Sequence, residues 1–362
     1  MPPASAPHVD PGFEKRLIEH ARPIAEHFLA SALHHFFNSG IYDRLCDAGG
    51  TQDIPTLASS MELDETRTLG FLLFLANEDI VVVKGMTVEL TRRAHDFAEF
   101  RAWYTLMIGG YSTTLDQLGD AMRNGAPGCS RNGRNVGLGS CEISKFDGMP
   151  MTRSLLAADG TEPQVVLDLG CGNGLYLIDF CKHMPGIEAW GVEPDPGSFR
   201  EARDLVQTAG IAERVHLINT SAEDFLANPP EGCRPDLIVF GYVLQEILGQ
   251  SGETEVVRTL ESITARFPNI VIVVIEVANE ITNAAVMRHG LARNFWNTYY
   301  LIHYFTNQRL ETADFWTALF DRAGLDLRHT VTTPEFVDST GLELGYLLRK
   351  RRAQTLAAVP SL

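Results

Sequence analysis

The spacing of apolar residues along this chain differs between two regions, one before residue 100 and one after residue 163. Between residues 27 and 47 apolar side chains recur at helical spacing, which predicts an amphipathic helix. Further helices are expected over 54–61 and 64–75, the second with Asp64 as its N-terminal cap. Residues 80–90 have the pattern of a β-hairpin that turns near Gly85. Helices followed by a hairpin predict a winged-helix-like domain over 11–100.

From residue 163 onward, short β-branched runs alternate with helical stretches. Strands are expected over 165–169, 189–192, 215–220, 237–240 and 270–277, and helices over 175–183, 197–209 and 254–266. This alternation predicts an α/β fold whose parallel sheet is covered by helices on both faces. The uninterrupted apolar run 270–275 is typical of a central strand. The final segments, 325–331 and 342–348, are expected to add an antiparallel strand pair.

The remaining segments complete the predicted domain organisation. Residues 101–155 are expected to form a helical connector and active-site lid, interrupted by a polar, glycine-rich stretch over 124–139. The sheet domain is expected over 156–350. We expect residues 1–10 to be disordered and residues 351–362 to form a solvated tail.

The most informative local motif follows the first strand of the expected sheet. Asp168 ends the apolar run, and Gly170, Gly172 and Gly174 follow at alternate positions. Glycines at this spacing allow a sharp turn and a close approach of a ligand to the backbone. The spacing differs from the G-x-G-x-x-G dinucleotide fingerprint. Glu193 ends the second strand, 25 residues after Asp168, where an acid commonly binds ribose hydroxyls.

These segments together resemble the Rossmann-like S-adenosylmethionine-dependent methyltransferases. The resemblance covers about residues 136–350 and rests on four segments in order, at 168–174, 192–195, 222–225 and 235–241. It implies a sheet that is mostly parallel with an antiparallel last strand, and S-adenosylmethionine as the cofactor. The implied cofactor-binding residues are Asp168, Gly170, Gly172, Gly174, Glu193, Pro194, Glu223, Asp224, Phe225, Phe240 and Gly241. Among these, Asp168 and the glycines hold the methionine end, Glu193 holds the ribose, and Asp224 and Phe225 hold the adenine.

Charge and composition narrow the partners of the protein. The formal net charge is −16, which argues against binding to a nucleic-acid backbone and against DNA recognition by the winged helix. The first domain instead resembles the dimerisation domain of the plant-type and polyketide-type O-methyltransferases, so we expect a homodimer. No signal peptide or membrane-spanning apolar run is apparent, and the six cysteines lack paired metal spacing. We therefore expect a cytoplasmic protein with reduced thiols.

The segment after the fourth strand departs from the O-methyltransferase pattern. Those enzymes commonly carry a His-Asp pair here, and the His removes a phenolic proton. This chain has Gln245 and Glu246, and an amide cannot act as a base near neutral pH. An amide oxygen and a carboxylate can bind a metal ion instead. From spacing alone, the later His303 would be assigned a structural role.

A second resemblance extends this metal hypothesis. Residues 299–310 resemble a metal-binding segment of the methyltransferases that act on the β-carbon of α-keto acids. It implies a metal site of Gln245, Glu246 and His303 that holds a divalent or ferric ion (Fe, Zn, Mn, Co or Ni), with a small anionic α-keto acid as substrate. In some of those relatives the first two ligands are His and Asp.

The expected reaction is C-methylation through a metal-chelated enolate, for a non-proteinogenic amino acid of a secondary metabolite. The ion would stabilise the enolate as a Lewis acid. His289 or a metal-bound hydroxide would remove the Cβ proton. Arg131 and Arg134 are candidates to bind the substrate carboxylate, and Tyr242 and Trp103 to line the acceptor pocket. The sequence does not choose among phenylpyruvate, 2-ketoarginine and branched-chain keto acids.

Two other functions remain open at this point. One is an O- or N-methyltransferase of a small metabolite, with Glu246 or His289 as general base. The other is a DNA-binding regulator that senses the cofactor, although the net charge predicts no salt-dependent retention on DNA.

Overall fold

The computed structural model describes residues 10–352, so the expected disorder of residues 1–9 and most of the expected tail lie outside the described residues. The chain separates into two compact units, residues 1–110 and 111–362. The connector expected over 101–155 is therefore divided between them. None of the helices within 10–352 is long and apolar enough to cross a membrane.

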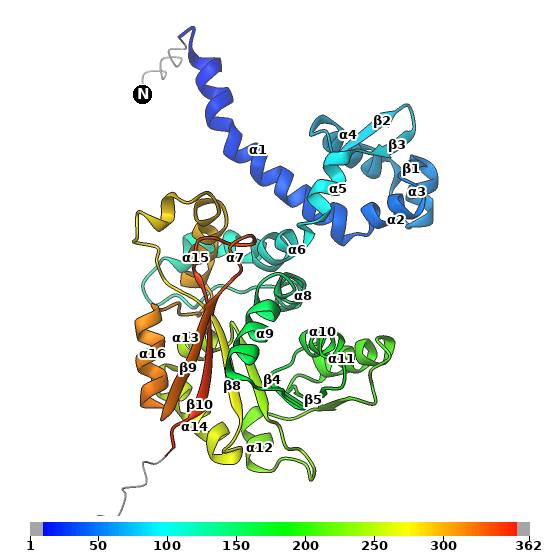
Figure 1. The fold of residues 1–362 in the computed structure, drawn as a ribbon. Helices are drawn as coiled ribbons and strands as arrows, with labels where there is room; N and C mark the ends of the chain where they lie inside the picture. The colour runs from blue at the N-terminus through cyan, green and yellow to red at the C-terminus, as the bar shows by residue number, and fades with distance from the viewer. Residues whose placement is uncertain (1–9, 353–362) are drawn as a thin grey trace, which may run out of the picture. The chain divides into compact units, whose positions relative to one another are not determined.

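The first unit combines helices with a small antiparallel sheet (Figure 1). Its helices are α1 (Phe13–Asn38), α2 (Ile41–Asp47), α3 (Ile54–Ser60), α4 (Glu65–Asn77), α5 (Arg92–Ala98) and α6 (Arg101–Tyr104). The strands β1 (Thr51–Asp53), β2 (Val81–Lys84) and β3 (Thr87–Leu90) pair in the order β1-β3-β2. Asp64 caps α4 by accepting a hydrogen bond from the Arg67 N–H at 2.8 Å, as predicted.

The helix expected over 27–47 is in fact two helices. Gly40 adopts a φ of +81° between α1 and α2, and this left-handed conformation ends the first helix. α1 also begins earlier than the apolar pattern indicated, at Phe13. A five-residue π-helix (Thr105–Gly109) and α7 (Gly110–Ala121) then lead into the second unit.

The second unit is built on a seven-stranded sheet in the order β6-β5-β4-β7-β8-β10-β9. The strands are β4 (Val165–Leu169), β5 (Glu188–Val192), β6 (Val215–Ile218), β7 (Leu237–Gly241), β8 (Val271–Val277), β9 (Leu325–Thr332) and β10 (Glu343–Lys350). Strands β6, β5, β4, β7 and β8 pair in parallel, whereas β10 runs antiparallel to both β8 and β9. The predicted mostly parallel sheet with an antiparallel last strand is thus confirmed.

Helices cover both faces of this sheet, as the alternation predicted. On one face α9 (Gly148–Asp159), α10 (Leu175–His183) and α11 (Pro196–Thr208) bury one apolar core. On the other, α12 (Ala222–Ala227), α13 (Leu244–Ser251), α14 (Glu253–Arg266) and α16 (Ala313–Arg322) bury a second core. The segment between β8 and α16 holds a short 3-10 helix (Val286–Arg288), a π-helix (Ala292–Trp296) and α15 (Asn297–Phe305).

The predicted interruption over 124–139 is only partly correct. α8 (Gly133–Ser144) already begins inside this glycine-rich stretch. Asn132 caps the helix by accepting a hydrogen bond from the Asn135 N–H at 3.1 Å. The cap and the tertiary context outweigh the low helix propensity of the glycines.

Candidate functional site

The glycine turn, residues 170–174, carries the chain across the carboxyl end of β4. Gly170, Gly172 and Gly174 have φ values of +91°, +55° and +73°, which side chains rarely adopt. The N–H groups of Gly170 and Cys171 donate to the carbonyl of Val192 at the end of β5, at 2.8 and 3.0 Å. The alternate glycines are therefore a conformational requirement, and they leave room for a ligand against the backbone.

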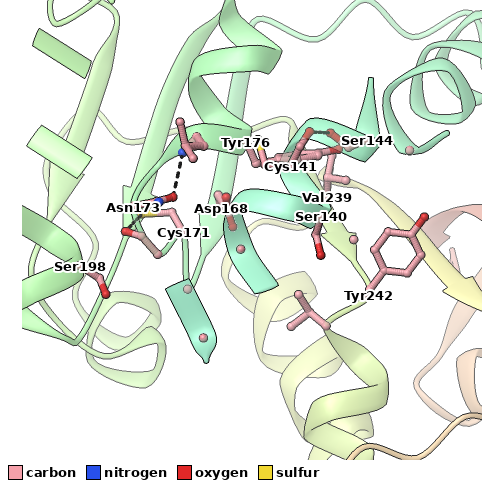
Figure 2. A pocket seen from close by; sticks show the side chains of 18 of the residues that line it. Ser140, Cys141, Ser144, Asp168, Cys171, Asn173, Tyr176, Ser198, Val239 and Tyr242 are labelled. Carbon is pink, nitrogen blue, oxygen red and sulfur yellow. Dashed lines mark hydrogen bonds between the residues drawn. The ribbon is translucent and has the colours of Figure 1, made fainter. Parts of the chain in front are cut away.

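A cavity of about 400 Å³ lies beside the glycine turn. Its walls come from β4, the turn, α8, α10, the end of β7 and β8, as Figure 2 shows for the labelled side chains. Among the predicted residues, those that line it are Arg134, Asp168, Gly170, Gly172, Gly241 and Tyr242. Sequence reasoning did not name the wall from α8, namely Ser140, Cys141 and Ser144, among the site residues, although these positions lie in the expected helical connector and lid.

Asp168 is the acidic group of this cavity next to the glycine turn (Figure 2). Burial raises the pKa of its carboxyl to about 7, and the nearby charge of Glu193 adds to the shift. A cationic ligand group beside Asp168 would favour the ionised carboxylate. The position thus suits an ammonium group such as that of a methionine moiety.

Glu193 lies behind the turn and does not line the cavity. Its Oε2 accepts a hydrogen bond from the Gly172 N–H at 2.9 Å, and its Oε1 accepts one from the Asp195 N–H at 2.7 Å. The carboxylate therefore ties the glycine turn to the end of β5, next to Pro194. Its expected contact with a ribose stays a prediction.

The expected adenine-binding segment lies on α12, outside the cavity lining. Glu223 and Asp224 are exposed, whereas Phe225 is buried in the core between the sheet and α14. Phe240 on β7 is also a core residue. The structure thus gives Phe225 and Phe240 packing roles, and their contacts with a cofactor remain predictions.

Tyr242 follows β7 in an unusual conformation. Its φ is +60°, a left-handed value that is uncommon for a residue with a bulky side chain. Its ring lines the cavity, and its hydroxyl donates to Glu343 Oε1 at 2.9 Å. Such strain persists only where the surroundings fix it, and it is concentrated at functional sites.

Two buried carboxyl groups stand behind Tyr242, and sequence reasoning missed both. Asp147, which caps α9, and Glu343 on β10 are each 5% exposed, and the charge of Asp147 acts on Glu343. Burial raises the pKa of Asp147 to about 6 and that of Glu343 well above its usual value. Burial thus favours the protonated form of both groups.

A buried polar cluster, here Gln245, Glu276, Tyr299 and His303, lies where α13, β8 and α15 meet. Gln245 Nε2 donates to the Tyr299 hydroxyl at 3.2 Å and lies 3.3 Å from His303 Nε2. Gln245, Glu276 and His303 are 1%, 0% and 2% exposed. The structure thus brings together two of the three predicted metal ligands, Gln245 and His303.

The third predicted ligand, Glu246, is engaged elsewhere. Its Oε1 lies 2.8 Å from Arg131 Nη2 and accepts a hydrogen bond from Gln308 Nε2 at 3.0 Å. Arg131 Nη1 is buried and has no hydrogen-bond partner among the described residues. Within residues 10–352, no three His, Cys, Asp or Glu side chains gather as a metal-binding group. The predicted metal ligands include only two side chains of these types, Glu246 and His303, and the third is the amide of Gln245.

The other predicted catalytic residues are not brought to this cluster. Arg134 lines the cavity but is largely exposed, with its Nη2 3.3 Å from Glu201 Oε1. His289 is exposed at the end of the 3-10 helix, and its Nε2 lies 3.1 Å from the Ser339 hydroxyl. Trp103 belongs to the first unit, where its ring packs edge-on against Phe100. The roles of His289 and Trp103 in catalysis remain predictions.

Comparisons with known proteins agree with this geometry. A methyltransferase-domain family model matches residues 166–289. The chain is 38% identical to a 2-ketoarginine methyltransferase of Streptomyces arginensis, over 95% of this chain and 98% of that protein. Its fold is similar to that of human N-acetylserotonin methyltransferase, solved with S-adenosylmethionine, at a TM-score of 0.64, 17% identity and coverage of 96% and 100%.

The similarity in fold extends to a mitomycin 7-O-methyltransferase. The TM-score is 0.60 and the identity 17%, over 93% of this chain and 98% of that one. The glycine turn, the order of the sheet and the near full-length match to a methyltransferase all point to one class of enzyme. The chain belongs to the S-adenosylmethionine-dependent methyltransferases.

Proposed function

We propose that this enzyme transfers the methyl group of S-adenosylmethionine to the β-carbon of an α-keto acid. The observation that carries the proposal is the full-length similarity to a protein whose name specifies a keto acid, 2-ketoarginine. Gln245 supports it further, because an amide at this position cannot remove a phenolic proton. We also propose that the product serves the synthesis of a non-proteinogenic amino acid of a secondary metabolite.

The cofactor is proposed to lie in the cavity with its methionine end against the glycine turn. Asp168 would pair with its ammonium group, and the free N–H groups at the start of α10 would face its carboxylate. The sulfonium already activates the methyl group. The protein therefore contributes mainly by positioning the acceptor carbon and excluding water.

Arg131 is proposed to bind the carboxylate of the keto acid. Its buried Nη1 has no hydrogen-bond partner within residues 10–352, and an unsatisfied buried donor is costly unless a ligand accepts from it. The ion pair with Glu246 holds the guanidinium in place. Two-pronged binding of a carboxylate suits this planar group better than it would suit a lysine.

A divalent ion fits Gln245 and His303. His303 Nδ1 donates to the Tyr299 carbonyl at 2.7 Å, so its lone pair is on Nε2, which accepts from the Gln245 amide at 3.3 Å and would have to exchange this contact for the ion. Burial lowers the His303 pKa to about 3. Gln245 Oε1 is buried and has no hydrogen-bond partner in the part of the chain that the structure describes. Glu246, the third expected ligand, would have to exchange Arg131 for the ion. A bound ion would supply Lewis-acid polarisation of the keto acid and so favour loss of the Cβ proton.

The first unit is proposed to form a homodimer. α1 exposes a series of large apolar side chains along its length, which are Phe13, Leu17, Ile18, Ile24 and Phe28. Contiguous exposed apolar surface on a helix commonly marks a protein interface. Absence of membrane and nucleic-acid partners and a cytoplasmic location stay predictions from the sequence.

The alternative function is O- or N-methylation of a small metabolite with Glu246 or His289 as base. The contacts of these two candidate bases favour the keto acid instead. Glu246 is bound to Arg131 and Gln308, and His289 is exposed and bound to Ser339. Neither group lines the cavity beside the glycine turn.

A panel of acceptors tests the proposal. The purified enzyme is incubated with S-adenosylmethionine and phenylpyruvate, 2-ketoarginine, 4-methyl-2-oxopentanoate, a phenol or an amine, each with and without chelator. Mass spectrometry of the products is expected to show a methylated keto acid, with the yield reduced by the chelator. Full turnover of the phenol or amine in chelator, with no methylated keto acid, would overturn the proposal.

A further inference from the structure

The arginine that is proposed to bind the substrate carboxylate is held by an ion pair at one of its nitrogens. Arg131 Nη2 lies 2.8 Å from Glu246 Oε1, and the two side chains are 23% and 30% exposed. Arg131 Nη1 is buried, and none of the residues that the structure describes accepts a hydrogen bond from it. Because the guanidinium is planar and rigid, the contact at Nη2 also restricts the direction in which Nη1 points. The placement of the Glu246 carboxylate therefore sets where Arg131 presents its unsatisfied donor.

A second donor, from Gln308, holds the same carboxylate oxygen. Gln308 Nε2 donates to Glu246 Oε1 at 3.0 Å, and Gln308 is only 8% exposed. Its own oxygen, Oε1, accepts a hydrogen bond from the Thr306 hydroxyl at 2.8 Å. An ionised carboxylate can only accept hydrogen bonds, so it requires the nitrogen of the amide, and the donating hydroxyl requires the oxygen. The Gln308 amide is thus fixed through both of its polar atoms.

The turn that follows α15 also holds the loop that precedes α8. The carbonyl of Phe305 accepts a hydrogen bond from the backbone N–H of Cys129 at 2.6 Å. Asn307, at a φ of +54°, packs so closely against Gly128 that a side chain at position 128 would overlap it. The same turn therefore supports this loop at its backbone as well as through the ion pair at residue 131.

The loop is tied to α7 immediately before its arginine. The backbone N–H of Ser130 donates to Gln117 Oε1 at 2.9 Å. The backbone that leads into Arg131 is therefore held, and the side chain with its several rotatable bonds is the part that remains adjustable. Its end group is held by Glu246, which is held in turn by Gln308.

We propose that Gln308 is a positioning residue for substrate binding: it fixes the Glu246 carboxylate and, through the ion pair, aims Arg131 Nη1 at the carboxylate of the keto acid. The inference rests on the proposed function and deepens it, because it names the residue that orients the arginine before the substrate arrives. A donor that is already held in place loses less entropy when it binds a ligand. Gln308 acts through two other side chains, so its effect belongs to substrate affinity and not to the chemical step.

Calorimetry and steady-state kinetics of the full-length enzyme with 2-ketoarginine and phenylpyruvate test this role. Gln308→Met keeps the length of the side chain but removes both hydrogen bonds of the amide. We expect the Kd and the KM of the keto acid to rise by about 3- to 10-fold, the value of one hydrogen bond, while kcat changes by less than about 2-fold. The rise should be similar for both acids, because they share the carboxylate and differ in the side chain.

The chain offers a matched control for this substitution. Gln164 is exposed at the start of β4, and its Nε2 donates only to the neighbouring carbonyls of Glu162 and Pro163. Gln164→Met loses the hydrogen bonds of an amide in the same way but lies outside the contacts of Arg131. It should leave the KM and kcat at their wild-type values.

A double-mutant cycle distinguishes positioning from a merely structural role. In the Arg131→Met background there is no guanidinium to orient, so the addition of Gln308→Met should change the KM by less than about 2-fold. Thr306→Val removes the hydroxyl that holds the Gln308 oxygen, and it should raise the KM by about 2-fold. This variant decides the question if Gln308→Met has a strongly reduced Tm.

The outcomes separate this inference from the proposed function. A wild-type KM in Gln308→Met and Thr306→Val, or an equal rise of the KM with and without Arg131, would overturn the inference. If Arg131→Met alone raises the KM, the carboxylate anchor stands and Gln308 has no part in it. Wild type that neither binds nor methylates a keto acid would refute the proposed function and the inference together.

Discussion

The glycine turn and the buried polar cluster are built in opposite ways. The glycine turn is one continuous stretch of five residues whose backbone conformation is set locally, with φ values above +50° at Gly170, Gly172 and Gly174. The buried polar cluster takes Gln245, Glu276, Tyr299 and His303 from three segments of the chain. The first therefore presents backbone groups, whereas the second presents side chains that only the complete fold brings together.

This difference indicates a division of labour. The glycine turn, with Asp168, suits a cofactor shared by many methyltransferases. The buried polar cluster and the neighbouring ion pair of Arg131 with Glu246 suit the acceptor, which differs among relatives. Substitutions in the first should weaken cofactor binding, and substitutions in the second should affect turnover and the KM of the acceptor.

The largest effect is expected from His303→Ala. Loss of the imidazole removes a proposed metal ligand, so kcat/KM for the keto acid should fall by about 10³-fold. The Kd of S-adenosylmethionine, measured by calorimetry, should change less than about 3-fold because the glycine turn is intact. An equal loss of cofactor affinity would show that the two regions are not separate.

Gly172→Val is expected to disrupt the glycine turn and so weaken cofactor binding. A β-branched residue at a φ of +55° is strained, and its side chain would enter the cavity. Calorimetry should show cofactor affinity lower by at least about 100-fold. Gly119→Ala, inside α7 with no atom near its missing Cβ and outside the cavity lining, is the matched control and should bind the cofactor normally.

Arg131→Met tests the carboxylate anchor. The KM for the keto acid should rise by about 10- to 100-fold, the value of a hydrogen bond to a charged group. Steady-state kinetics of Arg134→Met provides the comparison, since this arginine is largely exposed and pairs with Glu201. A larger change of KM in Arg134→Met than in Arg131→Met would show that Arg131 is not the arginine that binds the substrate carboxylate.

The smallest effect is a pH dependence of cofactor binding. The Asp168 pKa is raised to about 7, so the free enzyme carries a protonated carboxyl below that pH. An ammonium ligand binds the ionised form, so affinity should fall by about 5-fold from pH 7 to pH 6. Asp168→Asn should bind more weakly and without this slope. A flat profile in wild type would remove Asp168 from the ammonium site.

Much of the fold could be predicted because its signals are local. The β-branched runs, the cap at Asp64 and the alternate glycines each specify structure within a few residues. The break at Gly40 was missed because the apolar pattern continues through it, and the start of α8 was missed because its glycines masked a helix capped by Asn132.

The site was less accessible to sequence reasoning. Gln245 and His303 were proposed from a resemblance, and the structure places them in contact. Glu276 was overlooked at the end of an apolar run, and Asp147 and Glu343 are more than 190 residues apart in the chain. His289 was a candidate base and His303 a candidate metal ligand, yet the first is exposed and the second is buried. Only long-range packing distinguishes them.

The most direct test of the central claim uses a keto acid that carries two deuterium atoms on its β-carbon. The enzyme is incubated with S-adenosylmethionine and this substrate, and the product is analysed by mass spectrometry against an enzyme-free control for exchange. The account predicts a product that has gained a methyl group and lost one deuterium. A methylated product that retains both deuterium atoms would contradict it, because the methyl group would then be on oxygen or nitrogen.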